Sequence, residues 1–269
     1  MPITARLHWA LFLLWICAAS SNAGVFIVSS DKAFNDPDEK STTNRLYLDN
    51  DRIRIEIGEN ATGDVIIYRM DQRVFWILDH QNKTYMEITE QDLKKMAGTM
   101  NEAMQSMQKT LKDLPPEQRA MMEEMMKSNL PSEKSKMTYK KVSSGEKVGE
   151  WTTDKYIAMN ETAITEEVWT ARPEALGLKA EDFVGLNKMS EFFSEYFKDL
   201  DLYPPFITED QAQPGDYSGL PLRIISYERG EKVHQTEVKE IKRQNFQASL
   251  FDLPAGYTKQ ETEMDLDEE

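Results

Sequence analysis

Cysteine is almost missing from the 269-residue sequence, in which Cys17 is the only one. It lies in an amino-terminal segment with the layout of a secretory signal peptide, so removal of that segment would leave no thiol. Disulfide bonds and thiol catalysis would then be excluded. Many small secreted folds rely on disulfides, and this chain must rely on a buried core instead.

Histidine is scarce as well, with three residues, and the 32 basic residues are outnumbered by 47 acidic ones. The formal net charge of -15 repels nucleic acid and anionic lipid head groups, so neither is an expected partner. The sequence contains no His-Glu-x-x-His, no Gly-x-Ser-x-Gly and no phosphate-binding glycine loop. We therefore expect a protein that is not an enzyme, with no cofactor and no dedicated metal site.

Long hydrophobic runs are confined to the first residues, MPITARLHWALFLLWICAASSNAG. This segment has a basic start, an apolar run from about Trp9, and small residues at Ser21 and Ala23, which is the layout of a signal peptide. The apolar run is too short to span a bilayer comfortably. We expect cleavage of residues 1–23 after Ala23 and a periplasmic or secreted protein that is not integral to a membrane. An uncleaved anchor and a lipoprotein are the alternatives.

Alternation of polar and apolar residues predicts strands between about Arg45 and Ile88 and again from about Lys136. RIRIEIG, for example, places isoleucines on one face and charges on the other. Short strands with close turns indicate an antiparallel meander, with later hairpins turning at Asn160-Glu161 and Arg229-Gly230-Glu231. RVFWILD is apolar on both faces, so we expect it near the middle of the sheet or under a cover.

Helical spacing replaces this pattern in the middle of the chain. Thr89-Glu90-Gln91-Asp92 has the form of a capping box, and it precedes a helix expected from about Glu90 to Lys112. Pro115-Pro116 ends that helix and begins a second, so residues of about 90–130 are predicted to form a helical hairpin. A further helix is expected from about Glu181 to Asp199. Its apolar face would be formed by Phe183, Leu186, Met189, Phe193, Tyr196 and Phe197.

These patterns predict one α+β domain of about residues 24–259, followed by an acidic, disordered tail at 260–269. The strands are expected to form a curved antiparallel sheet, an open half-barrel. The helices, including the methionine-rich hairpin, are expected to cover its concave face.

Methionine is abundant, with 15 residues, and it concentrates in the expected hairpin. This flexible, polarizable side chain fills irregular gaps in cores and also forms apolar surfaces that adapt to several shapes. The stripe indicates either packing on the sheet or a lid over an apolar cavity for a lipid, an acyl chain or a lipidated or hydrophobic partner. The residues predicted to line such a site are Met96, Met100, Met104, Met107, Met122, Met125, Met126, Phe75, Trp76 and Phe193.

Other functions remain open beside this apolar-ligand hypothesis. The protein would be a structural or interaction protein of the envelope if its core were filled and had no pocket. Thioethers also suit monovalent copper, although the scarcity of histidine disfavours a copper-binding role. Exposed methionines can also serve as sacrificial targets of oxidation.

Four segments resemble a family of exported bacterial proteins, the domain-of-unknown-function family 4412. They are IIYRMDQRVFWILDHQNKTYMEIT, GEWTTDKYIAMN with EEVWTA, GLPLRIIS and SLFDLPAGYTK. The resemblance implies a fold similar to the periplasmic lipoprotein carriers (LolA-like), an open curved sheet with helices in its hollow. It implies no catalytic residue and not the carriers' activity. Many relatives have a cysteine where this chain has Thr153, so any thiol role in those relatives is absent here.

Overall fold

The computed structural model describes residues 23–34, 40–58, 63–115, 118–119, 137–160, 163–196 and 215–260. Nearly all of the expected signal peptide and of the acidic tail lie outside these residues. So does the second helix of the expected hairpin, except for residues 118–119. The expectations for these three segments stay predictions.

Twelve strands form one open sheet in the order β12-β6-β5-β4-β3-β2-β1-β11-β10-β9-β8-β7. Neighbouring strands pair antiparallel except for β12, which runs parallel to β6. The first six strands are β1 (Gly24–Ala33), β2 (Thr42–Asp49), β3 (Arg52–Ile57), β4 (Asp64–Arg69), β5 (Val74–Asp79) and β6 (Thr84–Thr89). The other six are β7 (Tyr139–Val148), β8 (Trp151–Asn160), β9 (Ala163–Ala171), β10 (Leu220–Glu228), β11 (Glu231–Gln244) and β12 (Thr258–Gln260). The open, curved antiparallel sheet predicted from the sequence is confirmed.

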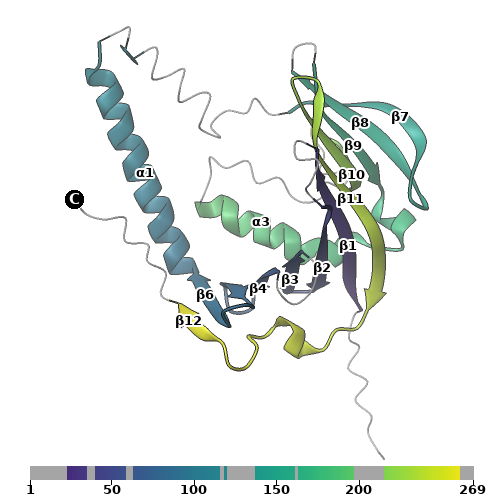
Figure 1. The fold of residues 1–269 in the computed structure, drawn as a ribbon, viewed down its shortest axis with the longest axis horizontal. Helices are drawn as coiled ribbons and strands as arrows, with labels where there is room; N and C mark the ends of the chain where they lie inside the picture. The colour runs from purple at the N-terminus through teal and green to yellow at the C-terminus, as the bar shows by residue number, and fades with distance from the viewer. Residues whose placement is uncertain are drawn as a thin grey trace, which may run out of the picture.

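The sheet bends sharply, so that β7 to β10 stand up from the layer formed by β2 to β6 (Figure 1). The hairpin of β10 and β11 turns where the sequence predicts. Arg229 and Gly230 have φ angles of 52° and 83° between β10 and β11. Two consecutive positive φ angles give a turn whose twist matches that of the flanking strands.

Two strands were not predicted from the sequence. β1 holds the middle of the sheet together, because it pairs with β2 on one side and with β11 on the other. Its apolar run is short and passes into polar residues, so its alternation is weak. β12 has three exposed residues and pairs only with β6, so tertiary contact rather than local pattern defines it.

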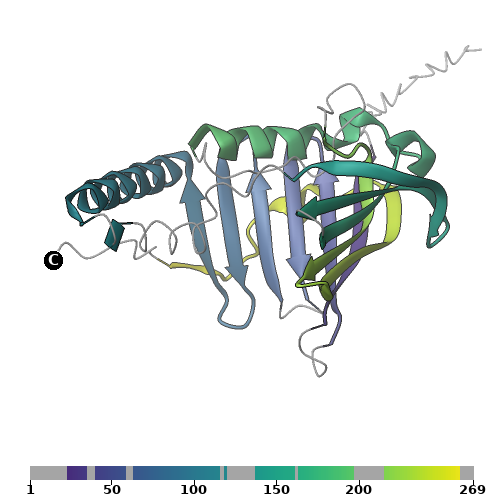
Figure 2. The ribbon, with the colours of Figure 1, turned by 90° about the horizontal axis from the view of Figure 1, so that it is seen from above.

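The helix α1 (Glu90–Asp113) begins at the predicted capping box. Thr89 accepts a hydrogen bond from the Asp92 backbone, and the Asp92 carboxylate accepts one from the Thr89 backbone at 2.8 Å. From there α1 runs past β6 and projects beyond the sheet (Figure 2). Neither helix of the described part of the chain is long and apolar enough to cross a membrane.

The helix α3 (Val184–Tyr196) covers one face of the sheet, which we call the inner face. It follows two short 3-10 helices, η1 (Pro173–Leu176) and η2 (Ala180–Phe183), and lies in the angle of the bent sheet (Figures 1 and 2). Apolar side chains of α3 and of the sheet form a continuous inner core. Its buried members include Val25, Ile27, Leu48, Ile53, Tyr68, Phe75, Leu93, Phe183, Leu186 and Phe192.

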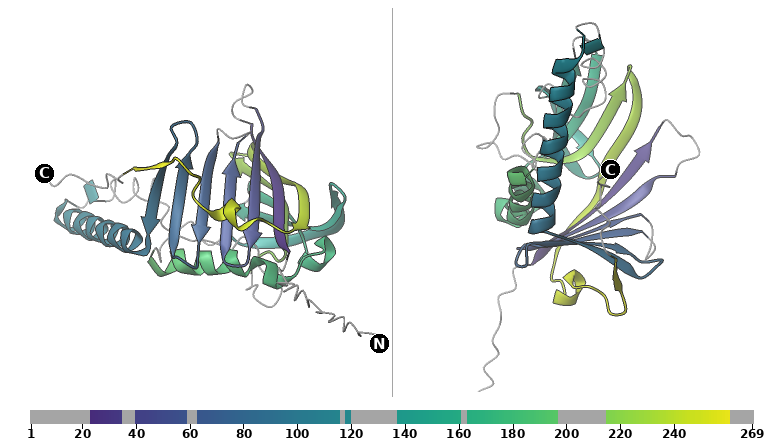
Figure 3. Two further views of the ribbon diagram at one scale, coloured as in Figure 1. Left: turned by 90° about the horizontal axis from the view of Figure 1, so that it is seen from below. Right: turned by 90° about the vertical axis from the view of Figure 1, so that its left-hand side faces the viewer.

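The opposite, outer face is covered by the carboxy-terminal segment, which carries the 3-10 helix η3 (Ala248–Phe251) and β12. This segment and α3 lie on opposite sides of the sheet (Figure 3). The buried outer core consists of Val65, Ile67, Val74, Trp76, Leu78 and Phe251. Strand β5 is therefore covered on both faces, as its two-sided apolar pattern predicts.

Phe251 is the side chain on which the outer cover depends, because it is fully buried at the end of η3. We expect Phe251→Ala to lower the free energy of unfolding by about 3–5 kcal/mol through lost burial and the cavity left behind. Urea denaturation measures this loss. The matched control is Phe34→Ala just after β1, where the ring is 37% exposed and the loss should stay under about 1 kcal/mol. Equal losses in the two variants would show that the segment does not hold the outer core.

Candidate functional site

An aromatic floor on the inner face seats the last turns of α3. Tyr68 of β4 and Phe75 of β5 are register partners, and their rings stack with centroids 4.2 Å apart. The ring centroid of Phe193 of α3 lies 4.8 Å from that of Phe75. The ring centroid of Phe192 lies 6.2 Å from those of both Tyr68 and Phe75. Offset and tilted aromatic contacts of this kind add to the stabilisation from burial alone. Two aromatic side chains of α3 thus pack on one aromatic side chain each from β4 and β5.

A polar latch closes one end of this aromatic cluster. Glu90, in the first turn of α1, accepts a hydrogen bond from the Tyr196 hydroxyl at 2.6 Å and pairs with Arg73 at 3.1 Å. The Arg73 guanidinium also lies over the Phe192 ring, 5.6 Å from its centroid. Three separate elements therefore meet at one carboxylate: the β4–β5 turn, the start of α1 and the end of α3. The hydrogen bond to Glu90 is the largest influence on the Tyr196 hydroxyl and raises the pKa of Tyr196 to about 12.

The methionines of α1 divide between the core and the surface. Met100 packs partly buried against the inner core, beside the buried Leu93 and Ala97. Met96 and Met107 are 36% and 37% exposed. Beyond Met100, each described side chain of residues 101–110 is exposed. The side chain of Met104 is outside the described set, as are the predicted lining residues Met122, Met125 and Met126.

Of the ten predicted lining residues, the structure brings three together on the inner core, namely Phe75, Phe193 and Met100. Trp76 belongs to the outer core instead, where its indole nitrogen donates to Glu87 at 2.9 Å. The prediction that Phe75 and Trp76 line the same site is corrected here. Successive residues of a strand point to opposite faces, so two adjacent residues cannot share a wall.

The sequence prediction missed Phe192, which is buried, and chose its neighbour Phe193, which is only partly buried. The signal was present in the spacing. Phe192 follows Met189 by three residues and precedes Tyr196 by four, so it lies on the same helix face as both. The apolar face of α3 is broad enough to include both phenylalanines.

A second polar network crosses β8 to β10. Trp169 lies between the Lys155 ammonium, 4.5 Å from its ring centroid, and the Arg223 guanidinium, at 5.5 Å. Lys155 also pairs with Glu167 at 2.7 Å, and Glu167 accepts from the Tyr227 hydroxyl at 2.7 Å. Burial would raise the pKa of Glu167, but hydrogen bonds from Lys155 and Tyr227 outweigh it and lower that pKa. Burial, followed by the hydrogen bond to Glu167, raises the pKa of Tyr227 to about 12.

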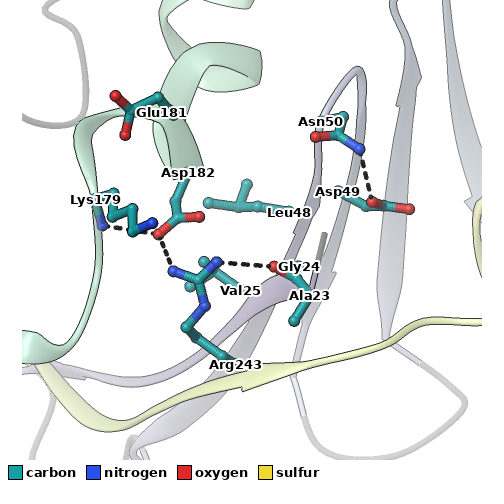
Figure 4. Close-up of a pocket in the computed structure, with 10 residues that line it drawn as sticks. All are labelled: Ala23, Gly24, Val25, Leu48, Asp49, Asn50, Lys179, Glu181, Asp182 and Arg243. Atoms are coloured by element: carbon teal, nitrogen blue, oxygen red, sulfur yellow. Dashed lines mark hydrogen bonds and ion pairs between the residues drawn. The ribbon is translucent and has the colours of Figure 1, made fainter. Parts of the chain in front are cut away.

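A cavity of about 290 Å³ opens where η2 meets the start of β1 (Figure 4). Arg243 reaches into it and donates to Asp182 at 2.7 Å and to the Ala23 carbonyl at 3.4 Å. Its lining is Ala23, Gly24, Val25, Leu48, Asp49, Asn50, Lys179, Glu181, Asp182 and Arg243. Most of these are polar, so this cavity is not the apolar compartment that the sequence predicts.

The structure keeps the two histidines downstream of Ala23 apart. His80 contacts the Tyr257 hydroxyl near the carboxy terminus, and His234 lies beside Asp31 and Thr236. Within the described ranges, no group of three or more His, Cys, Asp or Glu side chains could hold a metal ion.

These features define an α+β protein built on one open sheet. α3 covers the apolar inner face of this sheet, and the first turns of α1 add apolar side chains to the same core. Residues 90–257 match the family described as "Domain of unknown function (DUF4412)", so the chain belongs to that family. No curated protein matches the chain.

Several solved structures are similar in overall arrangement. An uncharacterized conserved protein from Thermus thermophilus matches with a TM-score of 0.41 and 8% identity, over 89% of this chain and 91% of that one. A structure of PNGF-II matches with a TM-score of 0.33 and 9% identity, over 88% of this chain but 31% of that one.

The LolA superfamily protein NE2245 from Nitrosomonas europaea matches with a TM-score of 0.26 and 10% identity, over 87% of this chain and 91% of that one. At these values the similarity is confined to a loose arrangement of sheet and helices. The function proposed below rests on the residues of this chain.

Tyr196 and Tyr227, whose pKa is raised to about 12, predict a loss of stability at high pH. Their folded-state pKa of about 12 exceeds the ordinary value of 10.0, so the unfolded chain releases these protons first. Their contribution to stability is fully present below pH 10 and is lost as the pH rises toward 12. We expect the double variant Tyr196→Phe/Tyr227→Phe to lose less stability than wild type across this window, by urea denaturation at each pH. Parallel curves from pH 9 to pH 12 would contradict the assignment.

Proposed function

We propose that the protein is an exported, non-enzymatic binding protein that holds an apolar ligand along α1 and the adjoining edge of the inner core. The ligand class is a lipid, an acyl chain or a lipidated or hydrophobic protein segment. One observation carries the proposal: the apolar stripe of α1 starts inside the inner core at Leu93 and Ala97 and continues to the exposed Met107. An apolar molecule lying on this stripe would be in contact with the core at one end.

The chemistry of the stripe supports a ligand of variable shape. Methionine side chains are unbranched, and their thioethers adapt to irregular surfaces. Met96 and Met107 are more than one-third exposed, whereas Met100 already packs against the core. Phe193, like Met100, is partly buried against the inner core and offers a flat aromatic surface there. An acyl chain could replace water along this path without opening the sheet.

The contacts of Glu90 fix one end of the boundary between α1 and the inner core, where the ligand is proposed to lie. These contacts to Arg73 and Tyr196 tie α1 to the sheet and to α3 where the aromatic floor begins. From residue 101 to residue 110, each described side chain of α1 is exposed, and burial returns only at Leu111, so ligand contacts between these two points would not compete with core packing. The proposed site therefore runs outward from the latch toward Met107.

A second function is favoured by the packing of the inner face. α3 fills the angle of the sheet with buried side chains such as Phe183, Leu186 and Phe192. An envelope structural or interaction protein with a filled core would show this packing without any small ligand. Binding measurements with variants of the exposed methionines distinguish the two functions.

The exposed methionines of α1 provide the sharpest test. We expect Met96→Asp/Met107→Asp to weaken binding of a fluorescent fatty acid at least tenfold, because each carboxylate must be desolvated against the acyl chain. Both side chains are exposed, so the fold should survive, as far-ultraviolet circular dichroism would verify. The matched control is Met159→Asp, an exposed methionine on β8 far from α1. Unchanged affinity in the α1 variant, or no binding by wild type, would favour the structural role.

Export is tested on the same chain. Expressed in a bacterial host with its own amino terminus, the protein should be recovered from the periplasm with a mass that corresponds to a start at Gly24. Ala23→Arg removes the small residue that a signal peptidase requires, and it should leave the precursor uncleaved. A full-length mass for the wild-type protein would contradict removal of the segment.

A further inference from the structure

The outer face carries a cavity of its own, of about 290 Å³, where the β3–β4 hairpin approaches the end of β5. Its lining is Arg45, Arg54, Glu56, Ile57, Gly63, Val65 and His80. This is a different surface from the one that α3 covers, and the proposed apolar site does not include it. Its volume is at the lower end of that of small-molecule pockets, so any ligand has to be small.

Sheet register places three of the lining residues on one row. Arg45 of β2 is the cross-strand partner of Glu56 of β3, and Glu56 is the partner of Val65 of β4. Val65 belongs to the buried outer core, so it forms an apolar floor under the two charged side chains. His80 follows β5 at the same end of the sheet and closes one side of the cavity.

Glu56, the one carboxylate among these seven lining residues, is already committed to other partners. Its Oε1 accepts from Arg54 Nε at 2.8 Å, and its Oε2 accepts from the Tyr47 hydroxyl at 3.3 Å. Arg54 also donates to the Leu250 carbonyl at 3.3 Å. Glu56 is therefore the ion-pair partner of Arg54, and both of its oxygens are turned to partners other than Arg45.

Among the described residues, Arg45 has no ion-pair partner. Among the residues that the structure describes, no carboxylate lies within ion-pair distance of it, and its one hydrogen bond is a long one, 3.5 Å, to the Gly58 carbonyl. The ring of His80 adds a polar wall. Its Nδ1 contacts the Tyr257 hydroxyl, and within the described ranges its Nε2 makes no hydrogen bond. A guanidinium that forms no ion pair with any described residue thus lines a cavity in a protein whose formal net charge is -15.

We propose that this outer-face cavity binds a small oxyanion, a carboxylate or a phosphate, through Arg45. A guanidinium presents a planar fork of donors that matches both anions and binds them by two parallel hydrogen bonds. His80 Nε2 supplies a further polar contact, and a short apolar group on the ligand would rest on Val65. The overall negative charge of the protein works against non-specific anion binding, so any binding here has to come from these local contacts.

Two sources could supply such an anion: a diffusible small molecule, or the acidic residues that follow Gln260 in this chain. The experiment therefore uses the full-length chain and a chain that ends at Gln260. Each is titrated with inorganic phosphate and with butyrate, with chloride replaced to hold the ionic strength constant, and melting temperature is followed. A saturable rise in melting temperature in both chains with equal apparent affinity indicates a diffusible ligand. Tighter binding by the shortened chain indicates that its own acidic residues compete for the same cavity.

The variants identify Arg45 as the binding group. Arg45→Met should weaken the apparent affinity for both anions at least tenfold, and Arg45→Lys should weaken it less, because it keeps the charge but loses the fork. The matched control is Arg229→Met in the β10–β11 turn, which removes an arginine from an exposed position and should leave the affinity unchanged. Equal responses in wild type and in Arg45→Met would overturn the proposal. So would the absence of a saturable response in both wild-type chains.

Discussion

The architecture depends on one constraint, which is that a single sheet has two apolar faces and both must be covered. Strand β5 shows it most directly, because Phe75 points into the inner core and Trp76 into the outer core. α3 covers one face and the segment around Phe251 covers the other (Figure 3). A chain without disulfides depends on the burial of both faces for most of its stability.

The functional surfaces lie at the borders of these two covers. On the inner side, α3 packs on the aromatic floor, and α1 carries the exposed Met96 and Met107 on either side of Met100, which packs against the core. On the outer side, the cover formed by the carboxy-terminal segment reaches Tyr257 and leaves the cavity at Arg45 open. One border is apolar and the other is cationic, so the two faces of the sheet are suited to ligands of different chemistry.

Local patterns predicted much of this structure from the sequence. The capping box at Thr89, the two-sided strand at Phe75 and the turn at Arg229 all depend on residues close together in the chain, and all are observed. The patterns did not reveal β1 or β12, whose pairing depends on distant segments. The candidate site was only partly predictable, because Trp76 was assigned to the wrong face and Phe192 was overlooked. The cavity at Arg45 joins residues from several strands and turns and has no local signature at all.

The central claim is that an apolar molecule occupies the seam between α1 and the inner core. Native mass spectrometry of protein freshly purified from the periplasm, combined with organic extraction, tests it most directly. The account predicts a mass increment matching one apolar molecule per chain, released by extraction and reduced in a variant with charged residues at Met96 and Met107. Repeated recovery of protein at the mass of the bare chain, with nothing extracted, would contradict it.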